Sequence, residues 1–79
     1  MEENKTLVEV TTDKILRYLK EKQLQVGDKL PNEYELSDYL EVGRSTVREA
    51  VRALASRNIL EVRQGAGTFV SDKRGIAND

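Results

Sequence analysis

The stretch at positions 43–58, GRSTVREAVRALASRN, constrains the fold more than any other part of the sequence. On a helix with about 100° between residues, its apolar and cationic side chains separate onto opposite sides. The apolar side carries Val47, Ala50, Val51 and Leu54, and the opposite side carries Arg44, Ser45, Arg48 and Arg52. We therefore expect an amphipathic helix that packs through one side and presents the other to solvent or to an anion.

The arginine side is unfavourable for an isolated helix. Arg44 and Arg48 are like charges four residues apart, as are Arg48 and Arg52, and each such pair costs about 0.2–0.5 kcal/mol. Arg44 also lies at the helix start, where the helix dipole disfavours a cation. A bound anion would explain the arrangement, and a solvated basic face without a partner is the alternative that this stretch alone leaves open.

The composition argues against an enzyme. The 79 residues include no cysteine and no histidine, which removes disulfides, the usual zinc ligands and the commonest general base. A chain of this length buries only about 60% of its unfolded surface and has no room for a deep catalytic pocket. We expect no catalytic residue, metal site or cofactor, and we interpret Glu33 and Glu35 as the negative first turn of a helix.

The sequence contains no recognisable membrane or secretion signal. No apolar run approaches the roughly 18 residues that a membrane span needs. The first ten residues, MEENKTLVEV, lack the basic and apolar regions of a signal peptide. We therefore expect a soluble, cytoplasmic protein without membrane contact.

The net charge of −1 argues at first against a nucleic-acid partner, but the charges are unevenly distributed. Residues 1–42 carry six Lys or Arg and ten Asp or Glu, a net charge of 6 − 10 = −4. Residues 43–65 carry five Arg and two Glu, a net charge of 5 − 2 = +3. Clustered arginines of this kind are typical of a surface that binds phosphate or guanine, so we expect an anionic partner.

The residues before position 43 predict two helices. The first spans residues 6–22, where apolar residues recur at helical spacing, and a turn at Gly27 and Asp28 follows it. Residues 29–31 should be extended, because a proline disfavours helix at the preceding residue. The apolar residues of the first helix are Leu7, Val10, Ile15, Leu16 and Leu19, with Tyr18 at the edge of the core.

A second, shorter helix should begin at Glu33 and end near Glu41. Asn32 and Glu35 form the N-cap and N3 pair of a capping box just ahead of an apolar stripe. The inner face of this helix would consist of Leu36, Tyr39 and Leu40. Only residues 41–43 separate it from the arginine helix, and such a short joint forces two helices to cross steeply, as in a helix-turn-helix.

The third helix should end at Asn58, and a hairpin should follow it. Asparagine often takes the left-handed position that closes a helix. The runs 59–64 and 68–71 are rich in strand-forming residues and flank a Gly-Ala-Gly loop, with Leu60, Val62 and Phe69 as candidates for the inward face. The two glycines supply the positive φ of a loop or let the loop enter a narrow groove, and both interpretations remain open.

Together these elements predict a mainly α fold with a small β-hairpin, the winged helix-turn-helix, built from three helices and a two-stranded C-terminal wing. We expect an N-terminal arm and the start of helix one at residues 1–9, the winged domain at 10–71, and a linker or tail at 72–79. In helix-turn-helix proteins the second helix of the motif lies in the major groove of DNA. The hairpin would then reach the flanking backbone or the minor groove.

The segment KLPNEYELSDYLEVGRSTVREAVRALASRNILEVRQGAGTFVS resembles the N-terminal DNA-binding domain of the GntR family of bacterial transcription regulators. The resemblance covers about residues 10–71 and rests on GDKLPNEYEL, RSTVREA and GAGTFV at fixed distances. It implies sequence-specific binding of double-stranded DNA. The recognition helix at 44–57 would lie in the major groove, and the wing at 63–68 would lie in or near the minor groove.

The resemblance also implies which residues contact DNA. They are Arg44, Ser45, Thr46 and Arg48 at the start of the recognition helix and Gln64, Gly65 and Gly67 at the wing tip. Arg52 lies further along the helix and is expected to contact a phosphate or to remain solvated. Tyr34 stands where the family has an arginine that touches the DNA backbone, and its hydroxyl could still bond a phosphate.

Two further departures from the family pattern concern the backbone. Glu41 replaces the usual glycine that closes the second helix, and a left-handed backbone there would cost about 1 kcal/mol or more. Gly43 replaces the serine or threonine that often caps the recognition helix. We expect Gly43 to serve as N-cap, a role in which glycine is tolerated.

Partners also follow from the resemblance. Such regulators are expected to bind a palindromic operator as homodimers, through a C-terminal domain that also binds a small-molecule effector. The present chain has no such domain, so the fragment alone should dimerise poorly and bind weakly. The alternative is a winged helix used as a protein-interaction module, which predicts apolar or aromatic residues on the recognition face, where this chain has Arg, Ser and Thr.

Overall fold

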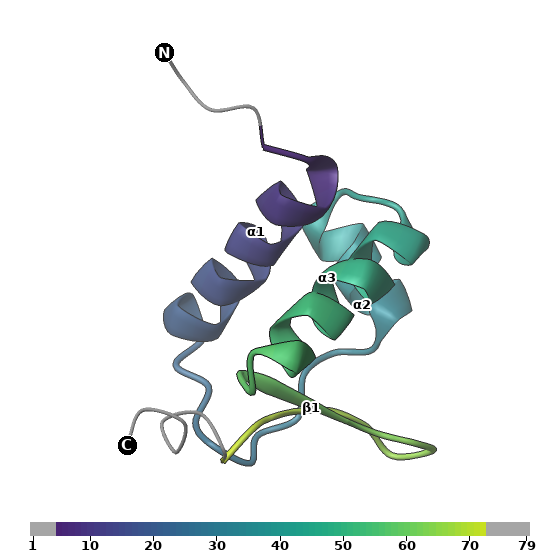
Figure 1. The fold of residues 1–79 in the computed structure, drawn as a ribbon. Coiled ribbons are helices and arrows are strands. Elements are labelled where there is room, and N and C mark those ends of the chain that lie inside the picture. Colours follow the sequence, from purple (N-terminus) through teal and green to yellow (C-terminus); the bar gives the residue numbers. More distant parts are fainter. Residues whose placement is uncertain (1–4, 73–79) are drawn as a thin grey trace.

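Three helices and one hairpin follow one another along the chain in the computed structural model, which describes residues 5–72. The elements are α1 (Leu7–Glu21), α2 (Glu33–Leu40), α3 (Arg44–Ser56), β1 (Leu60–Arg63) and β2 (Gly67–Val70). α3 packs against both α1 and α2, and the antiparallel hairpin extends beneath the helices (Figure 1). This arrangement confirms the predicted winged helix-turn-helix. The linker or tail predicted at 72–79 lies outside the described residues, apart from Asp72.

The core lies where the three helices meet the base of the hairpin. All four apolar residues predicted for the inner side of α3 are buried, which confirms its amphipathic character. Leu60 and Val70 face each other across the hairpin and are each only 2% exposed, so they attach the wing to the helices. The other buried apolar residues are Ile15, Leu19, Leu30, Leu36 and Leu40.

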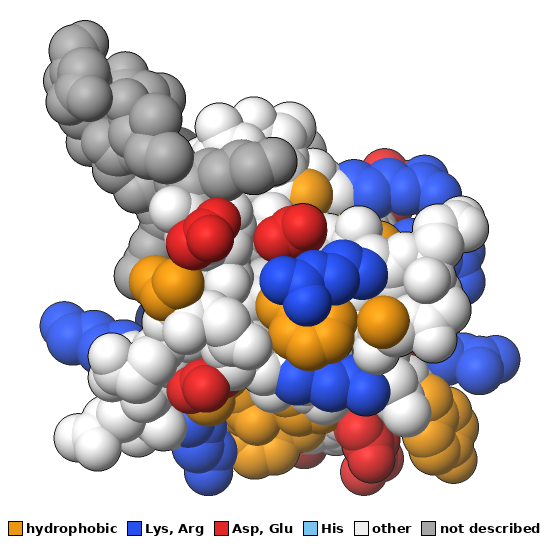
Figure 2. Space-filling view, turned by 90° about the horizontal axis from the view of Figure 1, so that it is seen from below, with side chains coloured by type: hydrophobic (Ala, Val, Ile, Leu, Met, Phe, Trp, Pro, Cys, Tyr) orange, Lys and Arg blue, Asp and Glu red, His pale blue; other side chains and the backbone are white. Residues whose placement is uncertain are grey.

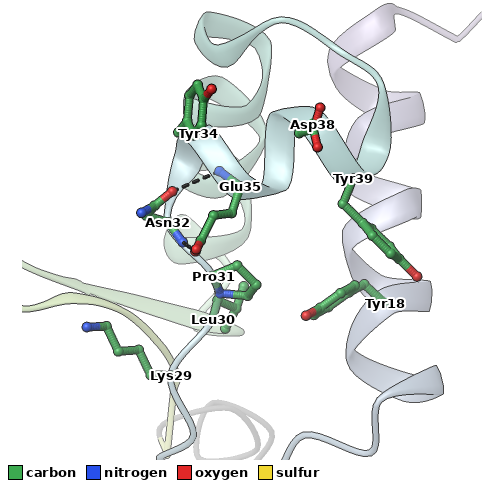
Figure 3. A pocket seen from close by; sticks show the side chains of 9 residues that line it. All are labelled: Tyr18, Lys29, Leu30, Pro31, Asn32, Tyr34, Glu35, Asp38 and Tyr39. Atoms are coloured by element: carbon green, nitrogen blue, oxygen red, sulfur yellow. Dashed lines mark hydrogen bonds between the residues drawn. The ribbon is translucent and has the colours of Figure 1, made fainter.

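Capping boxes fix the start of the first two helices. In α2 the Asn32 side chain accepts a hydrogen bond from the Glu35 backbone N–H at 2.8 Å, and the Glu35 carboxylate accepts one from the Asn32 N–H at 3.0 Å (Figure 3). This is the box that the sequence predicted. Thr6 and Glu9 form a second one ahead of α1, which was not predicted. An N-cap of this kind contributes about 1 kcal/mol.

The joint between α2 and α3 is short, as predicted, and closes with a left-handed residue. Glu41 has φ 60° and ψ 47°, and its backbone N–H donates to the Ser37 carbonyl oxygen. Val42 is partly buried against the core. Gly43 is the N-cap of α3 and makes no side-chain capping bond. The predicted cost of a non-glycine residue at position 41 therefore applies to this chain.

The hairpin differs from the prediction in its turn. β1 and β2 pair in the register Leu60↔Val70 to Arg63↔Gly67, so Gly67 belongs to the second strand. The turn consists of residues 64–66 rather than 65–67. Asn58 has the predicted positive φ, 62°, but α3 itself ends at Ser56.

The extended segment before α2 pairs with the wing, which the sequence did not predict. Leu30 donates its N–H to the Thr68 carbonyl oxygen at 2.8 Å, and Val70 donates to the Asp28 carbonyl oxygen at the same distance. Lys29 and Phe69 form the bridge between these two bonds. The segment thus lies along β2 on the side opposite β1.

Two residues predicted to face inward are exposed. Tyr39 is 55% exposed, because α2 buries only Leu36 and Leu40 and leaves Tyr39 at its edge, where the ring packs edge-to-face on Tyr18 at 5.2 Å. Val62 is 53% exposed, because it lies two residues beyond Leu60 towards the turn, past the end of the core.

Leu7, an apolar residue of the predicted first helix, is 58% exposed, because it is the first residue of α1. Thr11 and Thr12 are buried in the following turn. Their hydroxyls donate to the carbonyl oxygens of Leu7 and Val8 at 2.8 and 2.9 Å, so their polar atoms are satisfied inside the core.

Candidate nucleic-acid interface

The N-terminal end of α3 presents cationic and hydroxyl side chains to solvent. Arg44 and Ser45 are exposed, Thr46 is half-buried, and the first turn contains no acidic residue. Because the first backbone N–H groups of a helix lack partners within it, this end attracts an anion. Gly43 adds no side chain that would cover these groups. The start of α3 can therefore accept a phosphate or present donors to a base edge.

Arg48 is held by a carboxylate of the neighbouring helix. Its Nη2 lies 2.6 Å from Glu33 Oε2, and its Nε donates to Glu33 Oε1 at 3.3 Å. This hydrogen bond is the main reason that the pKa of Glu33 is lowered and the pKa of Arg48 is raised. Both side chains remain partly exposed, at 49% and 35%. The pair holds the Arg48 guanidinium of α3 beside Glu33, the first residue of α2.

Arg44 packs on an aromatic ring instead of a carboxylate. Its guanidinium carbon lies 5.7 Å from the ring centroid of Tyr34, within the range of a cation–π contact. Tyr34 is 67% exposed at the start of α2. Among the described residues Arg44 forms no ion pair, so its charge is free to meet an external anion.

Arg52 lies two turns further along α3, about 12 Å from Arg44 along the helix axis. Its Nη1 is 3.9 Å from Glu49 Oε2, and the arginine side chain is 68% exposed. An exposed pair at this distance contributes little. Arg52 is therefore available to an anion beside the helix.

The wing ends in an exposed turn with little side-chain bulk. Gln64 and Gly65 are exposed, and Gly65 has φ 77°, which a residue with a Cβ adopts only at a cost. Gly67 has φ 127° and is half-buried in β2. At the base of this turn the Arg63 guanidinium stacks over Phe69 at 4.3 Å. Figure 2, which views the molecule from the wing side, shows Lys and Arg side chains around a central hydrophobic patch.

A groove of about 460 Å³ separates the wing from α3 and the start of α2. Leu36, Val51 and Val62 contribute apolar side chains to it, and Arg48 and Arg52 contribute charge. Of the nine predicted site residues, Arg48 and Arg52 line this groove, and Gln64, Gly65 and Gly67 line a second one under the wing. Tyr34, Arg44, Ser45, Thr46, Arg48 and Arg52 lie on the helices, and Gln64, Gly65 and Gly67 lie on the wing.

Glu33 was not predicted as part of this surface. It is 15 positions from Arg48 in sequence, and only the crossing of α2 over α3 brings the two side chains together. The sequence did contain a signal for this contact: the predicted helix-turn-helix places the first turn of its first helix, which contains Glu33, beside its second helix, which contains Arg48. The charge pattern alone supported the simpler interpretation as an acidic first turn.

Residues 5–72 contain neither a metal-binding cluster nor a membrane-spanning helix. That range contains no group of three or more acidic residues placed to hold a metal ion. In the same range no helix is long and apolar enough to cross a membrane. A larger hollow, about 720 Å³, lies between α1 and α2 and is lined in part by Tyr18, Tyr39 and Asp38 (Figure 3). It does not include the arginines of α3.

The crossed helices, the short joint and the exposed wing define a winged helix-turn-helix of the DNA-binding type. The chain belongs to the gntR family of bacterial regulatory proteins, whose profile matches residues 7–70. This confirms the family resemblance stated from the sequence.

Two bacterial regulators illustrate the similarity. The chain is 39% identical over 72 residues to the uncharacterized HTH-type transcriptional regulator YcbG of Bacillus subtilis. The aligned stretch covers 91% of this chain and 31% of the relative. It is 39% identical over 71 residues to the mannosyl-D-glycerate transport/metabolism system repressor MngR of Escherichia coli, 90% of this chain and 30% of the relative. The chain therefore spans less than a third of the length of these relatives.

Solved structures agree with the fold. A Streptococcus agalactiae GntR structure superposes with a TM-score of 0.83 and 63% identity, covering 86% of this chain and 32% of that one. The DNA-binding domain of AraR in complex with operator ORX1 superposes with a TM-score of 0.77 and 29% identity, covering 86% of this chain and 82% of that one. The second structure shows this fold bound to an operator.

Proposed function

We propose that this chain binds double-stranded operator DNA sequence-specifically, as the DNA-binding domain of a bacterial transcription regulator. The recognition helix at 44–57 enters the major groove, and the wing at 63–68 lies in or near the minor groove. The observation that carries the proposal is the exposed N-terminal end of α3, where Arg44 has no ion-pair partner among the described residues. The AraR DNA-binding domain, which has a similar fold, forms a complex with an operator, and this supports DNA binding by the present domain.

The residues at the start of α3 read bases. Arg44 and Arg48 each carry the planar fork that binds the O6 and N7 atoms of guanine, and Ser45 and Thr46 add hydroxyls to the same end. Arg52 and the Tyr34 hydroxyl lie to the side and contact phosphates, which position the helix without reading sequence. Glu33 holds the Arg48 fork before DNA arrives.

The wing contributes contacts through its backbone and Gln64. Because Gly65 lacks a side chain, the turn can approach the sugar-phosphate walls of a narrow groove, and Gly67 follows it at the start of β2. The positive φ values of Gly65 and Gly67 are a structural reason for glycine at both positions, and entry into a narrow groove is the functional reason that we propose for Gly65.

The domain spans residues 10–71 and acts within a longer, cytoplasmic regulator. The curated relatives are about three times as long as the match, which leaves room for a C-terminal domain that dimerises and binds a small-molecule effector. A homodimer places two recognition helices on the half-sites of a palindromic operator. The single domain therefore binds one half-site weakly.

Selection of bound duplexes from a random library, followed by titration at several salt concentrations, tests the proposal. We expect an enriched half-site, and an affinity that falls with salt because each neutralised phosphate releases counterions. No enriched sequence together with salt-independent binding would instead favour a protein-interaction role for the same face.

A further inference from the structure

Lys29 is fixed against the wing by its backbone, although it lies outside the helix-turn-helix and outside the hairpin. It forms a bridge with Phe69 of β2. The hydrogen bonds on either side of it, Leu30 to Thr68 and Val70 to Asp28, are both 2.8 Å long. The base of this side chain is therefore positioned as firmly as a residue of a third strand.

The Lys29 side chain runs along the wing towards the turn. A Cβ built on Gly67 would lie 2.7 Å from Lys29 Cε and 3.5 Å from Nζ, so the lysine stem fills the space that the glycine leaves open. Figure 3 shows the side chain pointing along the hairpin, away from Tyr18 and Tyr39. Its ammonium group thus lies beside the outer half of the wing.

This ammonium group is uncompensated within the described part of the chain. Lys29 is exposed, and the ion pairs found among residues 5–72 involve Lys5, Arg48, Arg52 and Arg63 instead. Lys29 also lines a groove of about 470 Å³ under the wing together with Gln64 and Gly65. A positive charge held on a rigid edge beside the wing tip has the chemistry of a phosphate contact.

We propose that Lys29 binds a phosphodiester of the DNA strand bordering the groove that the wing tip enters. The inference rests on the proposed function. It adds a third contact with the DNA backbone, made by the segment before α2, to the contacts made by the recognition helix and the wing. Gly67 takes part indirectly, because the absence of its side chain lets the lysine lie along the hairpin. The contact is to the backbone and therefore independent of sequence.

Lys29→Met tests the proposal, because methionine keeps an unbranched apolar stem beside Gly67 and removes the charge. In a plot of the logarithm of the affinity against the logarithm of the salt concentration, the slope should become less negative by about 0.9, which is the contribution of one phosphate. Between 50 and 200 mM salt the variant should then lose about three- to four-fold less affinity than the wild type. Lys29→Arg should restore the slope.

Lys20→Met is the matched control, because Lys20 is an exposed lysine in the last turn of α1 and lines neither of the two grooves beside the wing. It should leave the slope almost unchanged. Equal slopes for Lys29→Met, Lys20→Met and the wild type, with all three folded by circular dichroism, would overturn the role of Lys29 while leaving DNA binding intact. If the wild type itself shows no salt-dependent binding to duplex DNA, the proposed function fails first.

Discussion

Glu33 and Arg48 restrain each other in the free domain, so the side chain proposed to read a base is already ordered before DNA binds. Ordering a long arginine in advance reduces the conformational entropy lost on binding. A carboxylate on a DNA-binding face also repels phosphate, which favours a position over the bases rather than over the backbone. Glu33 thus affects both the orientation of Arg48 and the part of the DNA, bases rather than phosphates, that can lie next to this carboxylate.

The titration of Glu33 measures this restraint. Because the Arg48 hydrogen bond lowers its pKa, the carboxyl should titrate below 4.5, the ordinary value, in a carbon-detected NMR titration. A folded-state pKa below the unfolded one stabilises the domain at neutral pH, and this contribution is lost as the pH falls from about 4.5 through the folded value. Arg48→Ala should return the Glu33 pKa towards its ordinary value.

Asp13 provides the internal control for that titration. Its carboxylate is paired with Lys5 at 2.7 Å, and its pKa is lowered chiefly by that hydrogen bond. Arg48→Ala should leave the Asp13 titration unchanged. A Glu33 midpoint that does not move in this variant would show that the ion pair is not formed in solution.

Arg52 should behave differently from the arginines at the helix start. If Arg52 contacts a phosphate rather than a base, as proposed, Arg52→Ala should weaken binding to the selected and to a scrambled duplex by the same factor and reduce the salt slope by about 1. Parallel titrations on the two duplexes measure both quantities. A selective loss on the selected duplex would assign Arg52 to base reading instead.

At the scale of the elements, the joint between α2 and α3 contains a local strain. Glu41 adopts the left-handed conformation with a full side chain. Glu41→Gly should therefore raise the free energy of unfolding by about 1 kcal/mol, measured by urea denaturation. Asn58→Gly, at a position with φ 62°, should change stability less, because asparagine tolerates this conformation. Equal effects at both positions would contradict the strain assigned to Glu41.

The helices could be predicted because their signals are local. The capping box at Asn32, the three-residue joint and the periodicity of α3 each depend on neighbours in sequence. The exposure of Val62 could not be predicted in this way, because it depends on where the core ends beneath the hairpin. The pairing of Lys29 with β2 and the bond between Glu33 and Arg48 depend likewise on segments that meet only after folding.

At the scale of the whole molecule, charge is divided along the chain. The N-terminal 42 residues have a net charge of −4, and residues 43–65 have +3. The arginines clustered in residues 43–65 attract DNA, so the local charge can steer the approach as well as add affinity. This division explains how a domain with a net charge of −1 can be a DNA-binding one.

A single domain should bind half of a symmetric site, so its affinity should rise when two copies are joined. Fusing residues 1–79 to a dimeric coiled coil through a flexible linker should raise the apparent affinity for a duplex with two half-sites by about 10²- to 10⁴-fold. Binding to a single half-site should stay within a factor of about two, which reflects only the doubled number of domains. Fluorescence anisotropy with both duplexes measures the difference, and no gain on the two-site duplex would contradict the dimeric arrangement.

The N-terminal end of α3 is proposed to read the base sequence. This role is tested most directly by the ratio of affinities for the selected duplex and a scrambled duplex, measured at one salt concentration for the wild type, Arg44→Ala and Arg48→Ala. We predict that each variant loses about 1–3 kcal/mol of binding free energy on the selected duplex and much less on the scrambled one, so that the ratio falls. A ratio that stays at the wild-type value in both variants would contradict base reading by this end of the helix.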